Sequence, residues 1–526
     1  MLQESLVEYG AKRAIITLTA ILCALLEIVD TTIVNVALND MRGNLGATLS
    51  EVGWVITAYA IGNVIIVPMT SWLSQQFGRR NYFAASIIIF TICSYLCGNA
   101  TSIWELVAFR FLQGLGGGAL LVTSQTIITE SYPVEKRGMA QAIYGLGVII
   151  GPTLGPPLGG YIVDHFSWPY IFYINIPIGV IATLLTLQFI RSPKYAEKKA
   201  PHEIDWLGIA LLAITVGSLQ YVLERGHEED WFESSTIIFL VTASILGLFF
   251  FIWRELRCKN PIVELRVLKN GNLRIGTIMS FILGFGLYGS TFILPLYTQS
   301  TLGWTAQQSG ALMIPAALTT AVMMPIIGKL LTKGVKQQYL VALGLFIFFI
   351  YSYWGYKAIT PDTGKDAFFW MLIARGVGLG LLFIPITALA LSSLRGQQIG
   401  QGAAFTGMMR QLGGSFGVAV ITTFLARQNM VYRNDLVGKL NVNDLNVQQR
   451  VTAMQHSFMS KGMAPDVALK ASYKVLDFSV TKQAAVLSYM DVFLYLGIMF
   501  LICIPFILLV RQKKSAQKID LSEAMH

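Results

Sequence analysis

Long apolar segments alternate with short polar ones along almost the whole chain, and their lengths predict membrane-spanning helices. A helix needs about 20 mostly apolar residues to cross the hydrocarbon core of a bilayer. By this measure the sequence predicts fourteen spans, at 14–38, 51–72, 82–100, 103–127, 138–160, 168–190, 205–223, 236–254, 273–297, 306–330, 338–357, 367–391, 400–426 and 486–510. The first segment is too long and too often interrupted by polar residues for a cleaved signal peptide, so we expect it to remain as a span. The predicted fold class is an all-α membrane protein.

Composition and charge agree with this interpretation. Of the 526 residues, 54% are hydrophobic and 13% are charged, whereas soluble domains carry about 25% charged residues. The net charge of +10 has a topological explanation, because 24 of the 39 Lys and Arg fall in segments on the side of the N-terminus and only 4 in the short loops opposite. Cytoplasmic loops carry the excess of Lys and Arg. We therefore expect both termini in the cytoplasm, a multi-pass protein of the cytoplasmic (inner) membrane, and no nucleic-acid partner.

A weak internal repeat divides the chain into two halves. Pro68 closes the second expected span and Pro325 the tenth, 257 residues later. Arg110 and Arg375 lie equally deep in the fourth and twelfth spans, 265 residues apart, and each precedes a run of glycines. Parallel halves with a site between them near the bilayer midplane suit alternating access. The predicted divisions are an N-terminal six-helix half at 1–192, a linker with two extra spans at 193–270, and a C-terminal six-helix half at 271–526.

Acidic residues inside the first span are the strongest functional signal. An ionisable group in a membrane-spanning helix costs at least about 2.5–3.5 kcal/mol, so its presence needs a reason. Glu27, Asp30, Thr31 and Asn35 follow one side of the helix, which predicts a polar stripe that faces inward. Asp30 and Arg110 lie at similar depths, so we expect them to meet. Asp30 is then either a proton carrier tuned by Arg110 or one partner of a static ion pair, and Glu27 is either a second acid or a contact for a cationic substrate.

The fifth span is unusually rich in glycine and proline. Small residues let helix backbones approach closely in a membrane, and prolines kink a helix against its neighbour. The run predicts a tight, bendable interface that gates one side of a transporter, although plain helix packing is the alternative. Its residues include Gly147, Gly151, Pro152, Gly155, Pro156, Gly159 and Gly160.

The energy source is expected to be an ion gradient. The sequence has no GxxxxGK[ST] phosphate-binding loop for ATP. The five Cys and five His are scattered, so neither a disulfide framework nor a metal site has support, and we expect no cofactor. No nucleophile and base stand together in the sequence, which argues against an enzyme.

Several motifs resemble those of the fourteen-span drug:proton antiporters of the major facilitator superfamily, the EmrB and QacA type. The matching segments are 30–38, 106–114, 147–160, 172–177 and 410–414. The resemblance implies export of lipophilic, often cationic compounds in exchange for protons, with the arginine of the fourth helix linked to proton transfer. On this basis the proton-coupling residues are Asp30, Glu27 and Arg110.

The loop after the second span matches the superfamily motif only in part. Gly78, Arg79 and Arg80 are present, but Ser71 and Gln75 stand where the superfamily usually has Gly and Asp. The loss of that acid puts the usual charge-based closure of the inner side in doubt.

The long extracytoplasmic loop 427–485 is a second unusual feature. It has little apolar bulk and contains two segments with helical character, 446–459 and 465–475. One interpretation is a surface for a periplasmic adaptor protein, and through it an outer-membrane channel, as EmrB-type pumps use. The other is a solvated cap without a partner.

The sequence therefore predicts a proton-coupled multidrug exporter of lipophilic, cationic drugs, with antibiotic resistance as its biological effect. Its partners are the lipid bilayer, protons and a small lipophilic substrate held between the halves. The alternatives are a superfamily exporter of a lipid or metabolite and a non-transporting membrane receptor or scaffold. The expected substrate lining is Asn35, Tyr59, Gln113, Tyr288, Phe292, Phe405 and Met408.

Overall fold

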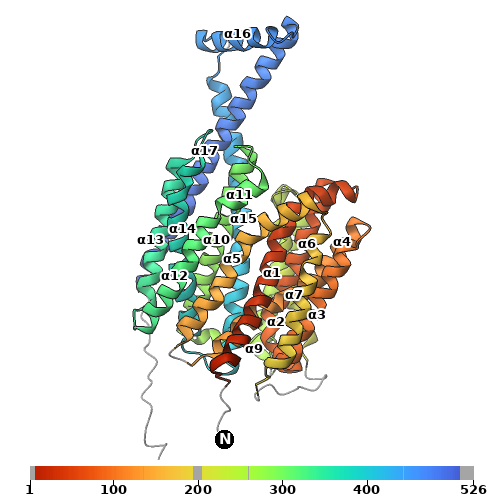
Figure 1. Ribbon diagram of the computed structural model, residues 1–526, viewed down its shortest axis with the longest axis vertical. Coiled ribbons are helices and arrows are strands. Elements are labelled where there is room, and N and C mark those ends of the chain that lie inside the picture. Colours follow the sequence, from red (N-terminus) through yellow and green to blue (C-terminus); the bar gives the residue numbers. More distant parts are fainter. Residues whose placement is uncertain (1–5, 134–135, 194–203, 259, 442, 510–526) are drawn as a thin grey trace, which may run out of the picture.

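The computed structural model describes residues 6–133, 136–193, 204–258, 260–441 and 443–509, and this part of the chain is almost entirely helical, with no strand. Figure 1 shows a bundle of long, roughly parallel helices with a stalk at one end. The helices are α1 Gly10–Asn44, α2 Leu49–Phe77, α3 Arg79–Gly98, α4 Ile103–Ser131, α5 Arg137–His165, α6 Tyr170–Tyr173, α7 Asn175–Phe189, α8 Trp206–Arg225, α9 Ser235–Arg257, α10 Gly271–Ser300, α11 Ala306–Leu312, α12 Ile314–Thr332, α13 Gln337–Ala358, α14 Lys365–Leu391, α15 Gln397–Lys439, α16 Leu445–Met459 and α17 Pro465–Leu509, with short 3-10 turns η3 Trp231–Glu233 and η4 Leu265–Lys269.

The predicted all-α membrane fold is confirmed. Thirteen stretches of helix among the described residues are long and apolar enough to cross a membrane. The remaining expected span, 400–426, is the thirteenth along the chain and lies within α15, which is helical but too polar to meet the same standard. Because α15 packs between α10, α17, α2 and α4, much of it faces protein rather than lipid, and it can carry polar residues.

Two expected spans are broken by a change of helix near one end. The segment predicted at 168–190 is α6 followed by α7, and the segment at 306–330 is α11 followed by α12. Pro177 lies in the first turn of α7 and Pro315 in the first turn of α12. Proline cannot donate a hydrogen bond to the preceding turn, so each helix starts afresh just before it.

The helix pairings repeat between the two ends of the chain. The pairs α1–α5, α2–α4, α3–α4 and α3–α7 correspond to α10–α15, α12–α14, α13–α14 and α13–α17. Glycines permit the same close approach in both groups. A β-carbon on Gly114 of α4 would lie 2.3 Å from the carbonyl oxygen of Tyr59, and one on Gly376 of α14 would lie 2.4 Å from that of Ala316. This likeness agrees with the duplicated halves that the sequence predicts.

Helices α8 and α9 form a pair beside this core. α8 packs against α2 and α15, so it bridges the two groups, and α9 packs mainly on α8. The outward side chains of α9, such as Phe239 and Phe249, are 70% and 64% exposed. An apolar helix exposed in this way is suited to contact with lipid.

The segment predicted as a long loop is instead a helical stalk, which we define as residues 427–485. It consists of the ends of α15 and α17, with α16 lying across their tip (Figure 1). The two helical segments predicted there correspond to α16 and the start of α17. α15 and α17 have 43 and 45 residues, or about 65 Å each at 1.5 Å per residue, which is about twice the thickness of a bilayer core.

Candidate functional site

A buried carboxylate on α1 is the centre of an extensive polar network in the bundle. Asp30 is completely inaccessible to solvent. Its Oδ2 accepts a hydrogen bond of 2.6 Å from Nη1 of Arg110 on α4. Its Oδ1 accepts bonds from Gln113 Nε2 at 3.1 Å and from Asn175 Nδ2 on α7 at 2.8 Å. Three helices are thus joined through one carboxylate.

Arg110 is held on several sides. Its Nη1 also donates to Gln113 Oε1 at 2.7 Å, and its Nε donates to the Val55 carbonyl at 3.3 Å. The guanidinium carbon lies 4.1 Å from the centre of the Tyr59 ring and 5.6 Å from that of Phe172. A buried cation over aromatic faces is stabilised by their quadrupoles. The arrangement fixes the charge that faces Asp30.

Glu27 lies one turn before Asp30 and has different partners. The side chain is 4% exposed. Oε1 accepts from Asn63 Nδ2 at 2.8 Å, and Oε2 accepts from the backbone N–H of Leu121 at 3.0 Å. Neither partner carries a charge, so a protonated Glu27 would leave no cation unpaired there, whereas a protonated Asp30 would weaken its bonds to Arg110.

The rest of the expected polar stripe is less buried. The Thr31 hydroxyl donates to the Glu27 carbonyl of its own helix at 2.9 Å, and Asn35 is exposed. Thus α1 places its two acids inside the bundle, while the polar residues beyond them lie increasingly at its surface.

The glycine run of α5 packs directly on the helix that carries both acids. Gly147, Gly151, Gly155 and Gly159 are spaced four residues apart and all face α1. A β-carbon on Gly155 would lie 2.0 Å from Oγ1 of Thr32, and one on Gly151 would lie 2.5 Å from Cγ2 of Ile28. Gly160 does not share this face, because its nearest neighbour would be 4.0 Å away. Pro152 and Pro156 lie between these glycines, and α5 runs through both.

The end of the bundle near the N-terminus carries several polar contacts. Arg79 makes a two-pronged ion pair with Glu130 of α4, at 2.6 and 3.1 Å, and both side chains are buried. Gly78 has φ +79°, a backbone conformation that favours glycine. Arg80 is exposed, and its backbone N–H donates to the Ser192 hydroxyl at 3.1 Å.

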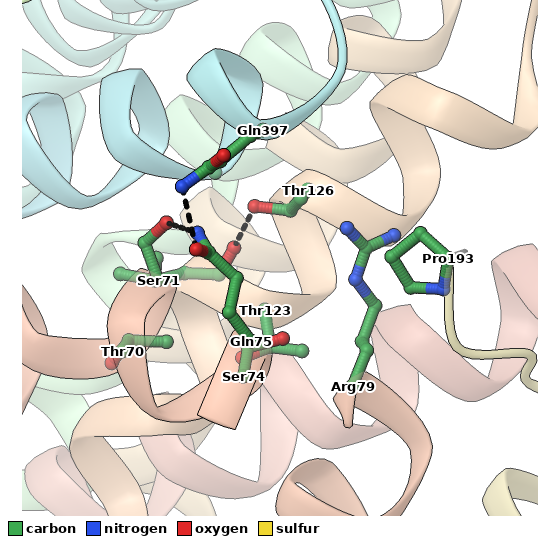
Figure 2. A pocket seen from close by; sticks show the side chains of 11 residues that line it. Thr70, Ser71, Ser74, Gln75, Arg79, Thr123, Thr126, Pro193 and Gln397 are labelled. Carbon is green, nitrogen blue, oxygen red and sulfur yellow. Dashed lines mark hydrogen bonds between the residues drawn. The ribbon is translucent and has the colours of Figure 1, made fainter. Parts of the chain in front are cut away.

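Gln75 joins the two halves at this end. Gln397 at the start of α15 donates from Nε2 to Oε1 of Gln75 on α2 at 2.6 Å, as Figure 2 shows. The contact borders a small pocket lined by residues of α2, α4 and α15, among them Thr70, Thr123 and Thr126, together with Arg79 and Pro193 (Figure 2). Where the superfamily motif usually has an acid, this chain has an uncharged hydrogen bond between its halves.

Two further arginines lie inside the second half. Arg375 of α14 donates from Nε to Ser290 at 3.0 Å and from Nη2 to Thr291 at 2.6 Å, both on α10. Arg410 of α15 lies with its guanidinium carbon 5.1 Å from the centre of the Phe383 ring. Among the residues that the structure describes, neither arginine has a carboxylate within salt-bridge distance, in contrast to Arg110.

Six of the seven residues expected to line a substrate site fall into three groups. Tyr59 and Gln113 belong to the network around Asp30. Tyr288 and Phe292 are half-buried on α10, and Tyr288 packs against Gly414 of α15. The third group is Phe405 and Met408, which pack in a cluster with side chains of α2 and the segment after α9, and the exposed Asn35 belongs to none of the three.

Sequence reasoning did not assign roles to Ser94, Asn63, Asn175 or Glu130. Ser94 accepts hydrogen bonds from Gln113 and Asn175, which extends the Asp30 network to α3. The sequence feature that points to these residues is a polar side chain within an apolar span, which is costly unless it has a partner. Within the described ranges, no three His, Cys, Asp or Glu side chains are grouped so that they could hold a metal ion.

The comparisons with known proteins decide the family. Residues 20–418 match the Major Facilitator Superfamily. The chain belongs to this superfamily. The superfamily is one of transporters, and this member is a multi-pass membrane protein. The resemblance drawn from the motifs is thereby confirmed.

Superfamily members with curated names are similar over most of the chain. The multidrug export protein EmrB of Escherichia coli (strain K12) is 34% identical over 457 residues, which cover 86% of this chain and 88% of EmrB. The fatty acid resistance protein FarB of Neisseria gonorrhoeae is 33% identical over 503 residues, which cover 95% of this chain and 97% of FarB. The crystal structure of the human organic anion transporter MFSD10 matches with a TM-score of 0.58 at 15% identity, over 94% of this chain and 100% of that one. That likeness shows the shared fold.

Proposed function

We propose that this protein exports lipophilic drugs across the cytoplasmic membrane in exchange for protons, by alternating access. Similarity to the multidrug export protein EmrB over 86% of the chain supports drug efflux. The sequence-based preference for cationic compounds stays a prediction. Both termini are proposed to face the cytoplasm, on the charge asymmetry of the loops, so the stalk would lie on the outer side.

The observation that carries the proposal is the buried pair of Asp30 and Arg110. Asp30 is 14 residues from the end of α1 at Asn44, or about 21 Å, and therefore lies well within the bundle. Charge-assisted hydrogen bonds contribute about 1.5–3 kcal/mol each, so a proton on Asp30 would weaken its hold on Arg110, Gln113 and Asn175. Protonation from the outer side would then loosen α1 from α4 and α7, and release of the proton to the inner side would restore the contact.

Movement of α1 has a direct route to the rest of the bundle. The glycine face of α5 follows α1 closely, and α5 also packs against α12 and α14 of the other half. A movement of α1 caused by a change at Asp30 would therefore alter the packing between the halves. In this scheme Gly147, Gly151, Pro152, Gly155, Pro156 and Gly159 form the gating interface, whereas Gly160, also predicted for it, does not face α1 and lies outside it.

The other predicted residues take supporting roles in the proposal. Arg110 tunes Asp30, and Glu27 is a second acid with uncharged partners. Gly78, Arg79 and Arg80 hold the inner loop. A substrate between the halves would contact some of the expected lining residues, among them Tyr288 and Phe292, which are half-buried on α10.

The test is ethidium transport by the purified protein in liposomes with an imposed proton gradient. Asp30→Asn keeps the shape of the side chain but removes the exchangeable proton. We expect gradient-driven transport to fall to the level of empty liposomes. Asp40→Asn is the matched control, because Asp40 lies exposed on the same helix, and it should behave like the wild type. Gradient-driven transport that survives in Asp30→Asn would exclude Asp30 as the proton carrier.

A lipid or metabolite exporter is the second candidate, and similarity to the fatty acid resistance protein FarB over 95% of the chain favours it. The same liposomes loaded with a single-chain lipid in place of ethidium distinguish the two cargoes. Absence of any substrate-driven proton movement would favour the third class, a receptor or scaffold.

We also propose that the stalk contacts a periplasmic adaptor protein, and through it an outer-membrane channel, rather than forming a cap without a partner. Several apolar side chains on it are exposed, including Val431 at 54%, Leu445 at 66% and Phe478 at 68%. Where such side chains form one contiguous patch, the patch marks a protein contact, and an adaptor would cover them.

Phe478→Glu should reduce drug resistance of intact double-membraned cells but leave liposome transport unchanged, because the liposomes contain no adaptor. Gln449→Glu, at an exposed polar position of α16, is the control. Equal resistance of Phe478→Glu and the wild type would favour the cap.

A further inference from the structure

Arg410 is a buried cation without a carboxylate partner. The side chain is 4% exposed, and its Nη1 has no hydrogen-bond partner. No Asp or Glu oxygen among the described residues lies within 4.0 Å of it, since the ion pairs found there involve other cations. The guanidinium instead lies over the ring of Phe383.

Other buried arginines of the bundle are matched. Arg79 is paired with Glu130, Arg110 with Asp30, and Arg225 with Glu228. Arg375 donates to two hydroxyls. A charge inside a membrane bundle is costly and is typical of a ligand or ion pathway when no protein group balances it.

The position of Arg410 suits a substrate site between the halves. Arg410 comes from α15 and Phe383 from α14. Tyr288 of α10 packs on Gly414, one turn after Arg410, and the side chain of Tyr144 on α5 is hydrogen-bonded with Arg410. Helices of both halves therefore converge on one cation. Glu27 does not neutralise it by direct contact, because its two oxygens accept from Asn63 and from the Leu121 backbone.

We propose that Arg410 binds the anionic headgroup of lipophilic acids, which would make amphiphilic carboxylates a class of cargo for this exporter. This inference rests on the proposed transport function. A guanidinium offers two parallel N–H donors that match the two oxygens of a carboxylate. The rings of Phe383, Tyr144 and Tyr288 supply the apolar surface that the first carbons of the tail would contact.

The rival role for Arg410 is a distant counter-charge that steadies Glu27. In that case its removal would affect all cargoes alike, and neutralising Glu27 as well would compensate. A binding site for anions makes the opposite prediction, because the effect should follow the charge of the ligand.

The experiment measures binding of two probes with the same twelve-carbon tail, tritiated dodecanoate and tritiated dodecyltrimethylammonium, to the full-length protein in lipid nanodiscs. Empty nanodiscs give the background. Arg410→Gln should weaken dodecanoate binding at least about tenfold, since a charge-assisted pair is lost, and should leave the cation unchanged or bound more tightly. The dodecanoate affinity of Arg410→Lys should lie between those of the wild type and Arg410→Gln, because lysine keeps the charge but lacks the two parallel N–H donors.

Arg427→Gln is the matched control, since Arg427 lies exposed on the same helix, and it should bind both probes like the wild type. Unchanged dodecanoate binding in Arg410→Gln, or equal loss of both probes, would overturn the proposal. So would full recovery of dodecanoate binding in Glu27→Gln/Arg410→Gln. A folded Arg410→Lys protein with intermediate affinity keeps the test valid if Arg410→Gln is unstable.

Ethidium transport by the wild type separates this inference from the proposed function. If dodecanoate binding depends on Arg410 but the wild type moves no cargo, the binding site stands and the export proposal fails. If the wild type exports ethidium and Arg410→Gln binds dodecanoate normally, only the assignment of Arg410 fails.

Discussion

The two halves of the bundle carry an arginine at corresponding depths but surround it differently. In the first half, Arg110 meets the carboxylate of Asp30 at 2.6 Å. In the second half, Arg375 meets the hydroxyls of Ser290 and Thr291 at 3.0 and 2.6 Å. Ser290 follows Asp30 by 260 residues and Arg375 follows Arg110 by 265, so the positions match in the repeat. The acid of one half is replaced by a hydroxyl in the other.

This difference indicates which half contains a group that can take up and release a proton. A carboxylate beside an arginine changes the local charge when it takes a proton, but a hydroxyl does not titrate in the physiological range. The first half therefore holds the group that can switch, and the second half holds permanent positive charge in Arg375 and Arg410. We infer that proton coupling belongs to the first half.

Moving the acid from one half to the other tests the comparison most severely. Asp30→Asn should abolish proton-driven ethidium transport in liposomes, and Ser290→Asp added to it should not restore transport, because α10 lacks the contacts of Asp30 with α7 and α4. Recovery in the Asp30→Asn/Ser290→Asp protein would mean that either half can carry the proton.

Neutralising each arginine should have unequal effects on stability. Arg110→Gln leaves Asp30 buried without its cation, which costs about 3–5 kcal/mol. Arg375→Gln removes two hydrogen bonds to neutral groups, and we expect a loss of about 1–3 kcal/mol. Thermal unfolding of the two purified variants in the same detergent measures the difference, and equal losses would contradict the asymmetry.

A methyl group on the glycine face of α5 should block its contact with α1. Gly155→Ala forces a β-carbon to within 2.0 Å of Thr32, and overpacking of this kind costs about 1–3 kcal/mol. Ethidium transport should fall roughly 10-fold or more on that scale. Gly160→Ala, with no neighbour closer than 4.0 Å, serves as the reference and should transport normally. Similar transport by both variants would show that this interface does not gate.

The smallest expected effect concerns the uncharged contact between the halves. Gln75→Ala removes one hydrogen bond to Gln397, worth about 0.5–1.5 kcal/mol. The arrangement in which Gln75 meets Gln397 should become about 2- to 10-fold less populated, which cysteine labelling of Thr126→Cys in the Gln75→Ala background can measure. Gln398→Ala, at the next, exposed position, should leave labelling unchanged. Equal labelling in all three proteins would show that the hydrogen bond between Gln75 and Gln397 does not hold the two halves together.

The sequence was sufficient to predict the contact of Asp30 with Arg110, because each is a rare charge in an apolar span and depth along a helix follows from residue count. It did not predict Asn175, Ser94 or Glu130 as partners. Small polar residues occur throughout these spans, and which of them face a given carboxylate depends on how far each helix is rotated about its axis.

The fold shows a similar division. Hydropathy located the spans, but it treated residues 427–485 as a loop because helices in water need little apolar content. In the structure α15 and α17 extend beyond the bundle into this segment, and α16 lies across their tip. Hydropathy also cannot distinguish a span that faces lipid from one that faces protein. α15 is more polar than its neighbours because much of it packs against other helices.

The most direct test of the central claim is the proton movement that ethidium drives. Liposomes with a pH-sensitive dye inside, and no imposed gradient, should show a pH change when ethidium moves through the wild-type protein. Asp30→Asn should bind ethidium yet produce no pH change, while Asp40→Asn should match the wild type. An ethidium-driven pH change of normal size in Asp30→Asn would contradict the assignment of Asp30 as the proton carrier.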